Sequence, residues 1–357
     1  MLIYILKRLF LIIPTLFTII TINFFIIQTA PGGPVERMLA QIENIDGDSA
    51  KGGFGYGGEV SLLQHSYKAS SGLDKELIVE IQKLYGFDKP LWERYLMMVR
   101  NYIIFDFGES FYKQQKVLDL VIERLPVSVS LGLWSTLFIY LISIPLGIKK
   151  AVQHHSSFDI ATSFVVIICH AIPTFLIAIL LIILFSGGSF LEIFPLKGLS
   201  SDYSENLGFF ERIIDYLWHI TLPVTALTLG GFASLTLLCK NSFLEEISKQ
   251  YTLTARAKGA NERQILYGHI FRNAMLIVVS GFPAAFVGIF LSGSLLIEII
   301  FSLDGLGLLG YEAALNRDYP IVFGTLYIFT LIGLITTLIS DISYKLIDPR
   351  IDFEARS

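Results

Sequence analysis

Six apolar segments constrain the fold of this chain more than any other feature. They occupy residues 9–27, 127–148, 160–185, 220–238, 275–301 and 321–339. A helix of about 20 residues crosses the bilayer core and satisfies its own backbone hydrogen bonds there. With 53% hydrophobic and only 16% charged residues, the chain is too apolar for an ordinary water-soluble domain. We therefore predict an all-α integral membrane protein with six transmembrane helices.

The first apolar segment follows Lys7 and Arg8, an order that a secretory signal peptide would also show. However, the segment is longer than the apolar part of a signal peptide. The following Gln28-Thr-Ala30-Pro31 does not supply a small-x-small cleavage site. The sequence therefore favours an uncleaved first transmembrane helix within residues 1–30.

Residues 31–126 are mostly polar and form the only sizeable region outside the membrane. Helical spacing of apolar residues predicts two short amphipathic helices here, at 74–84 and after Pro90. Gly53, Gly55 and Gly58 match G-x-G-x-x-G, but no strand precedes them, so a flexible linker is the better interpretation. A five-helix core at 127–344 follows, with a polar loop at 240–274, and residues 345–357 form a tail.

Charge predicts the topology. Lysine and arginine are concentrated before the first segment, at 149–159, at 240–274 and in the tail, whereas the opposite short loops carry only Lys197, Arg212 and Arg317. The positive-inside rule then places both termini in the cytoplasm and residues 31–126 outside. The net charge of −4 argues against a nucleic-acid partner. Cys169 and Cys239 lie within or at the end of apolar segments and cannot build a metal site.

Adjacent histidines occur in the predicted cytoplasmic turn at 149–159. Neighbouring side chains point away from each other on a helix, and no further metal ligand is nearby, so His154 and His155 are interpreted as part of a solvated turn.

The centre of the 240–274 loop reads Tyr251-Thr-Leu-Thr-Ala-Arg-Ala-Lys-Gly259. If residues 248–267 are helical, Ala255 and Gly259 lie on one face at i, i+4 spacing, where another protein could approach closely. Basic residues surround this face, namely Lys249, Arg256, Lys258, Arg263 and Arg272. We interpret the loop as a docking element; an amphipathic helix lying on anionic lipid is the alternative.

The loop resembles that of permease subunits in binding-protein-dependent ABC importers, whose pattern is Glu-Ala-Ala, three residues, Gly, nine residues, Ile-x-Leu-Pro. Ala255 and Gly259 match, whereas Leu253 and Thr254 replace the first two residues and His269-Ile-Phe-Arg272 replaces the last four. The oligopeptide and dipeptide branch is more similar. Its resemblance extends to Asp106-Phe-Gly-Glu-Ser110, Arg124-Leu-Pro126, Ile144-Pro-Leu-Gly147, Asn316-Arg-Asp-Tyr-Pro320 and Asp348-Pro-Arg350. The insertion at 38–72 is similar to that of the microcin C and oligopeptide importer.

This resemblance implies a type I ABC importer permease fold in a bacterial inner membrane. It also implies a second homologous permease subunit, ABC ATPase subunits, a periplasmic peptide-binding protein and a peptide substrate, beside membrane lipid. ATP would be used by the partner subunits, since the chain lacks G-x-x-x-x-G-K-[ST]; we expect no bound cofactor, no metal and no catalytic residue. The expected ATPase-docking residues are Tyr251, Thr254, Ala255, Arg256, Ala257, Lys258 and Gly259.

Glu298 is a carboxylate inside an apolar segment, one turn from its outer end. Such a group usually faces a water-filled cavity or a partner. We regard Glu298 and the nearby Asp304 as candidates for the translocation pathway or its gate, and a structural role of Glu298 near the mouth remains an equal alternative.

The sequence fits two other functional classes less well. An ion-coupled secondary transporter needs buried titratable groups, and the segments contain almost none besides Glu298 and Asp341. An intramembrane enzyme would be expected to carry H-E-x-x-H or G-x-S-x-G, and neither motif occurs.

Overall fold

The computed structural model describes residues 2–29, 89–186, 190–201, 203–282, 285, 288 and 295–347. The regular elements within these ranges are helices, and Glu109 and Lys116 form an isolated β-bridge. The helices are α1 (Leu2–Thr29), α5 (Leu91–Ile103), α6 (Val117–Val152), α7 (Ser157–Ala171), α8 (Thr174–Phe185), η1 (Ser204–Asn206), α9 (Phe209–Ile247), α10 (Gln250–Ala257), α11 (Glu262–Ile265), the π-helical η2 (Leu266–Ile270), α12 (Phe271–Ser280), α14 (Leu295–Ile300), α15 (Leu306–Asn316) and α16 (Tyr319–Ile347).

In the described part of the chain, four helices are long and apolar enough to cross a membrane. They confirm the first, second, fourth and sixth predicted segments, and they lie in α1, α6, α9 and α16. The fifth predicted segment falls partly outside the described residues, which contain only α12 and α14 from it.

The third predicted segment is not one continuous helix. It consists of α7 and α8, which are bent relative to each other by 97°. Pro173 causes this break, because proline disfavours the α conformation in the preceding residue, and Ile172 is accordingly extended, with ψ of 122°. The bent pair counts as a fifth span only if both helices together cross the membrane.

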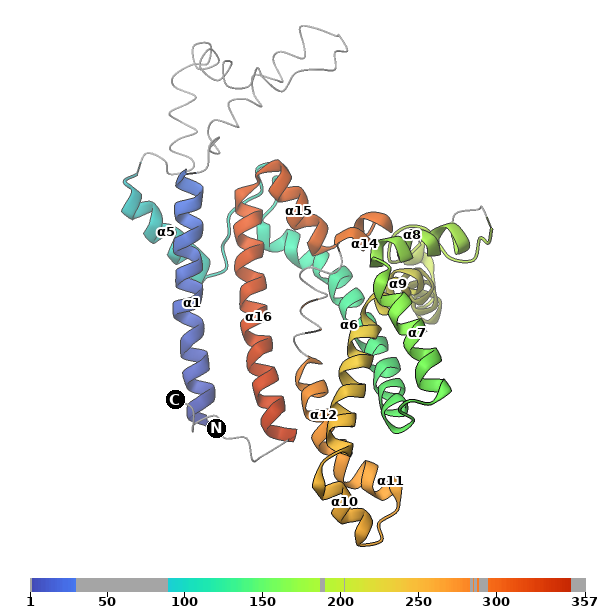
Figure 1. The fold of residues 1–357 in the computed structure, drawn as a ribbon. Coiled ribbons are helices and arrows are strands. Elements are labelled where there is room, and N and C mark those ends of the chain that lie inside the picture. Colours follow the sequence, from blue (N-terminus) through green and yellow to red (C-terminus); the bar gives the residue numbers. More distant parts are fainter. Residues whose placement is uncertain are drawn as a thin grey trace. The chain divides into compact units, whose positions relative to one another are not determined.

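The chain divides into two units, Met1–Ile12 with Asp119–Arg317 and Ile328–Ser357, and Ile13–Leu118 with Asp318–Tyr327. In the first unit α9 is central, since α7, α8 and α12 all pack against it. Figure 1 shows α10 and α11 at one end of α9, whereas α14 and α8 lie toward the other end of the same unit.

The first unit also holds one of the carboxylates that an ion-coupled transporter would need. Asp341 of α16 accepts a hydrogen bond from the Tyr4 hydroxyl at 2.8 Å. The same carboxylate forms an ion pair with Arg8 at 3.1 Å. Asp341 therefore has a fixed structural role between α1 and α16.

In the second unit, α5 confirms the amphipathic helix predicted after Pro90. Tyr95 packs edge-on against Phe17 and Phe24 of α1, and its hydroxyl lies 2.7 Å from the Thr21 hydroxyl. These contacts hold α5 along the second half of α1. The helix predicted at 74–84 and the insertion at 38–72 lie outside the described residues.

Candidate functional site

The polar loop after α9 folds into two short helices, α10 and α11, which lead through η2 into α12 (Figure 1). Asn261 begins the second helix. Its side chain accepts a hydrogen bond from the Gln264 backbone at 2.8 Å, and the Gln264 side chain accepts one from the Asn261 backbone at 3.0 Å. This capping box starts a new helix in the middle of the stretch. The continuous helix considered for 248–267 is therefore interrupted.

Ala255 and Gly259 do not share one helix face, so the i, i+4 interpretation is wrong. The helix ends at Ala257, and Gly259 follows with a positive φ of +88°. Ala255 is half-buried and packs against an apolar cluster that contains Phe243 and Ile265. Gly259 is exposed, and a Cβ atom there would meet nothing within 4 Å. Its role within the chain is conformational, because other residues rarely adopt this φ.

A charged network fixes α10 to the end of α9. The Tyr251 hydroxyl donates a hydrogen bond to Glu246 at 2.6 Å, and Lys249 pairs with the other oxygen of the same carboxylate. Burial and the hydrogen bond to Glu246 raise the pKa of Tyr251, and the hydrogen bond to Glu246 also raises the pKa of Lys249. Tyr251 therefore anchors the predicted docking segment from inside.

An ion pair crosses the turn between α10 and α11. Arg256 donates from Nε and Nη2 to the two carboxylate oxygens of Glu262, at 2.8 and 2.9 Å. The guanidinium lowers the pKa of Glu262 and is itself shifted upward in pKa by the carboxylate. Both side chains are exposed, so the pair adds little stability, but its paired geometry defines the shape of the turn.

The outer surface of this segment mixes apolar and polar side chains. Leu253 and Tyr267 are each 58% exposed, although both are large and apolar in character. Tyr267 also lines a shallow depression of about 420 Å³ with Asn261, Arg263 and Gln264. Exposed apolar groups beside basic ones are typical of a surface that a protein covers. Sequence reasoning overlooked both residues, although Leu253 stands where the family pattern has glutamate.

Five members of the predicted docking set are exposed in the same segment. They are Thr254, Arg256, Ala257, Lys258 and Gly259. The structure thus divides the predicted set into these exposed residues and the inward-facing Tyr251 and Ala255.

Glu298 is completely buried, and it holds the beginning of α15. Its carboxylate accepts hydrogen bonds from the Leu308 backbone at 2.7 Å and from the Ser128 hydroxyl at 3.3 Å. The Ser128 oxygen accepts a further bond from the Leu306 backbone at 2.8 Å. A negative charge is stabilised at a helix N-terminus, where backbone N–H groups lack partners within the helix. The geometry assigns Glu298 a positioning role for α15.

Asp304 lies beside this network but at the surface. Its carboxylate accepts two hydrogen bonds from Arg124 of α6, both at 2.8 Å. The Arg124 side chain is only 9% exposed, whereas that of Asp304 is 65% exposed. Arg124 therefore ties the loop before α15 to α6, and Asp304 presents the outer edge of this contact.

Gly305→Ala is expected to destabilise the protein by about 1–3 kcal/mol. A Cβ atom at this position would overlap the buried Glu298 carboxylate. Gly310→Ala, within the α15 helix that Gly305 precedes, is the matched control, because a Cβ atom there meets nothing within 4 Å. Thermal unfolding of the two purified variants measures the difference, and equal midpoints would show that the Glu298 contact adapts freely.

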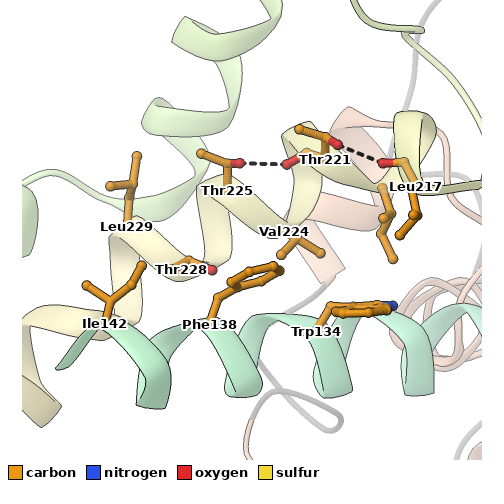
Figure 2. Close-up of a pocket in the computed structure, with 10 residues that line it drawn as sticks. Trp134, Phe138, Ile142, Leu217, Thr221, Val224, Thr225, Thr228 and Leu229 are labelled. Atoms are coloured by element: carbon orange, nitrogen blue, oxygen red, sulfur yellow. Dashed lines mark hydrogen bonds between the residues drawn. The ribbon is translucent and has the colours of Figure 1, made fainter. Parts of the chain in front are cut away.

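An apolar groove of about 320 Å³ lies between α6 and α9 (Figure 2). The Thr221 and Thr225 hydroxyls donate hydrogen bonds to carbonyl oxygens of α9, at 2.6 and 2.7 Å. These polar groups are therefore satisfied within the helix, and the two residues contribute apolar methyl groups to the groove. The Thr228 hydroxyl is buried and has no hydrogen-bond partner among the described residues. The lining residues, none of them charged, are Trp134, Phe138, Ile142, Leu217, Ile220, Thr221, Val224, Thr225, Thr228 and Leu229.

No metal site was found in the parts of the chain that the structure describes: no three His, Cys, Asp or Glu side chains there are placed to hold an ion. His154 instead lies 3.1 Å from the Asp159 carboxylate.

Comparison with known proteins places the chain in a family. Residues 143–353 match the binding-protein-dependent transport system inner membrane component. Over 361 residues, 99% of both chains, the sequence is 57% identical to the inner membrane ABC transporter permease protein YejB of Escherichia coli O157:H7. It is also 57% identical, over 362 residues and 99% of both chains, to the peptidoglycan transport system permease protein YejB of Agrobacterium fabrum.

A more distant relative extends the comparison to a second group of permeases. The chain is 32% identical over 351 residues to the oligopeptide transport system permease protein AppB of Bacillus subtilis, covering 98% of this chain and 99% of that one. The family match confirms the permease fold class predicted from the sequence. Because the matched region is more than half of the chain and the relatives align along its whole length, the protein belongs to the inner membrane components of binding-protein-dependent transport systems.

Proposed function

We propose that this chain is one of two membrane-spanning permease subunits of an ATP-driven peptide importer. The observation that carries the proposal is its 57% identity, over nearly its full length, to permeases of which one is named for peptidoglycan transport. The 32% identity to an oligopeptide permease points to the same substrate class. The substrates are oligopeptides and modified peptides of the microcin C type. A periplasmic peptide-binding protein delivers them, and a homologous second permease completes the pathway.

The exposed surface of α10, the following turn and α11 is the docking site for the ABC ATPase subunits. Its mixture of exposed apolar and basic side chains suits a protein partner, and residues 240–274 are the longest of the polar segments that carry the predicted cytoplasmic lysines and arginines. ATP is bound and hydrolysed by those partners. With the docking segment in the cytoplasm, both chain termini are cytoplasmic as well.

Movement of the ATPase subunits would reach the membrane through α9. The Glu246 network joins α10 to the end of α9, and α7, α8 and α12 pack against α9 along its length. A tilt of the docking segment therefore moves a packed group of helices as a rigid body, which suits alternation between inward-open and outward-open arrangements.

The two carboxylates that an ion-coupled transporter could use are both engaged in contacts within the chain. Both oxygens of Glu298 accept hydrogen bonds around the start of α15, and Asp341 is bound to Arg8 and Tyr4. The family match also favours an ATP-driven system over an ion-coupled one. Uptake of a labelled tripeptide into cells tests this point. It should persist with an uncoupler when ATP is held constant, and loss of uptake under that condition would restore the ion-coupled interpretation.

Ala257→Trp is expected to release the ATPase subunits from the purified chain and to lower peptide uptake by about tenfold or more, an effect of the size seen at protein-interface hot spots. Ala257 is exposed at the end of α10, so the added ring meets an incoming partner before it disturbs the chain. Ala314→Trp is the matched control, since Ala314 is an exposed alanine in α15.

Affinity purification from mildly solubilised membranes measures the effect of both tryptophan variants, with every co-purifying polypeptide identified. The control should retain the ATPase and a second permease. Retention of the ATPase by both variants, with undiminished uptake, would place docking elsewhere.

A further inference from the structure

A buried charge cluster joins three helices of the first unit. Asp159 of α7 accepts hydrogen bonds from Lys240 of α9 at 2.7 and 2.8 Å, and Lys150 of α6 lies 3.0 Å from the same carboxylate. The Lys150 side chain is completely buried, and its ammonium also donates to the Thr162 and Ser163 hydroxyls, each at 2.8 Å. One carboxylate thus serves two lysines.

The surface above the cluster adds further positive charge. Lys149 is exposed, and its ammonium lies 4.2 Å from the centre of the Phe158 ring. Asp159 is the only carboxylate in residues 149–159, and it is already shared. The nearest acidic residues along α9, Glu245 and Glu246, both pair with Lys249. Among the residues that the structure describes, no ion pair neutralises Lys149, so the end of α6 carries excess positive charge.

This charge lies at the ends of the predicted membrane segments. The apolar parts of α6, α7 and α9 end at Ile148, Ile160 and Leu238, immediately beside the lysines and Asp159. Basic side chains at the end of a transmembrane segment lie at the level of lipid headgroups. An anion at this height is most simply a phospholipid phosphate.

An apolar path leads from Lys149 into the membrane. Pro145, Ile142, Phe138 and Trp134 follow it on α6 at helical spacing, and the last three line the groove in Figure 2. Phe138 is 39% exposed and Ile142 is 44% exposed. At 1.5 Å per residue, Phe138 lies about 16 Å from Lys149 along the axis of α6. This length is about half of a bilayer core, the thickness that one acyl chain fills.

We propose that this face of α6 binds an anionic glycerophospholipid, with its phosphate at Lys149 and one acyl chain in the groove between α6 and α9. A peptide suits the groove less well, because its charged termini would find no charged partner among the lining residues. The proposal needs only that the chain is embedded in the membrane, so it stands apart from the proposed peptide transport and ATPase docking.

Photolabelling of the assembled complex in detergent tests the proposal. The probe is a phosphatidylglycerol that carries a diazirine at the end of one acyl chain, with the phosphatidylcholine analogue beside it. We expect the anionic probe to label residues 134–142 or 217–229 preferentially. Lys149→Gln should lower this labelling about fivefold, the effect of one basic residue on anionic lipid. Lys149→Arg, and Lys113→Gln in the other unit, should leave it unchanged.

Three results would overturn the proposal. Equal labelling by the phosphatidylcholine analogue would mean that the groove takes any lipid. Competition by sn-glycerol 1-phosphate as effective as that by the whole lipid would indicate a site for free phosphate. Absence of labelling in the groove, with Lys149 protected from an acylating reagent, would show that a partner subunit covers this face.

Discussion

Asp159→Ala is expected to lower the free energy of unfolding by about 3–5 kcal/mol, the usual effect of removing one partner from a buried ion pair. The substitution leaves the completely buried Lys150 ammonium without a counter-charge, and Lys240 loses both of its contacts to the same carboxylate. The two lysines would then repel each other in a region of low dielectric. Thermal unfolding of the purified protein in detergent measures the loss.

Two comparisons make this prediction specific. Glu192→Ala removes an exposed carboxylate and should change the midpoint little. Combining Lys150→Met with Asp159→Leu removes a buried ion pair as a whole, and such replacements are often neutral or stabilising. The double variant should therefore recover the part of the stability that depends on Lys150, whereas the part due to Lys240, which still loses its partner, should remain lost. A loss below about 1 kcal/mol in the single variant would mean that water reaches Lys150.

Gly259→Leu is expected to abolish both peptide uptake and co-purification of the ATPase, while the chain remains inserted in the membrane. The left-handed backbone at φ of +88° costs a leucine about 1–2 kcal/mol, which distorts the turn between α10 and α11. A Cβ atom at this position meets nothing within 4 Å, so the side chain begins in open space on the surface proposed for the partner. Uptake assays and affinity purification report the two effects.

Gly259→Asn separates the two causes of that loss. Asparagine adopts positive φ more readily than other residues with side chains, so this variant adds volume with less backbone strain. If the turn is the docking surface, Gly259→Asn should also lose ATPase, though less completely. Full ATPase retention by both variants would contradict docking through this turn.

The membrane segments were predictable because their signal is local. A long apolar stretch by itself predicts a helix in the membrane. Residues 127–148 and 220–238 lie in α6 and α9 as expected. The third segment was predicted less well. Its composition is uniformly apolar across the Pro173 break, so hydropathy does not distinguish two bent helices from one straight helix.

The docking segment was located correctly as a polar loop, but its internal geometry was not. Helical spacing placed Ala255 and Gly259 together, whereas the capping box at Asn261 and the positive φ of Gly259 separate them. The signal was present in the sequence, since Asn261 followed by Gln264 is typical of a helix start. The exposure of Leu253 and Tyr267 could not be predicted from the sequence, because it depends on which side of each helix packs against α9 and α12.

Composition, segment length and charge distribution were sufficient to indicate a multi-pass membrane protein, since each depends on neighbouring residues and on the solvent around them. The roles of single charged residues depended instead on partners far along the chain. Ser128 and Glu298 are separated by 170 residues, and Lys240 lies 81 residues from Asp159. Folding alone brings such groups within hydrogen-bond distance, and a buried carboxylate is stable only where those distant donors meet it.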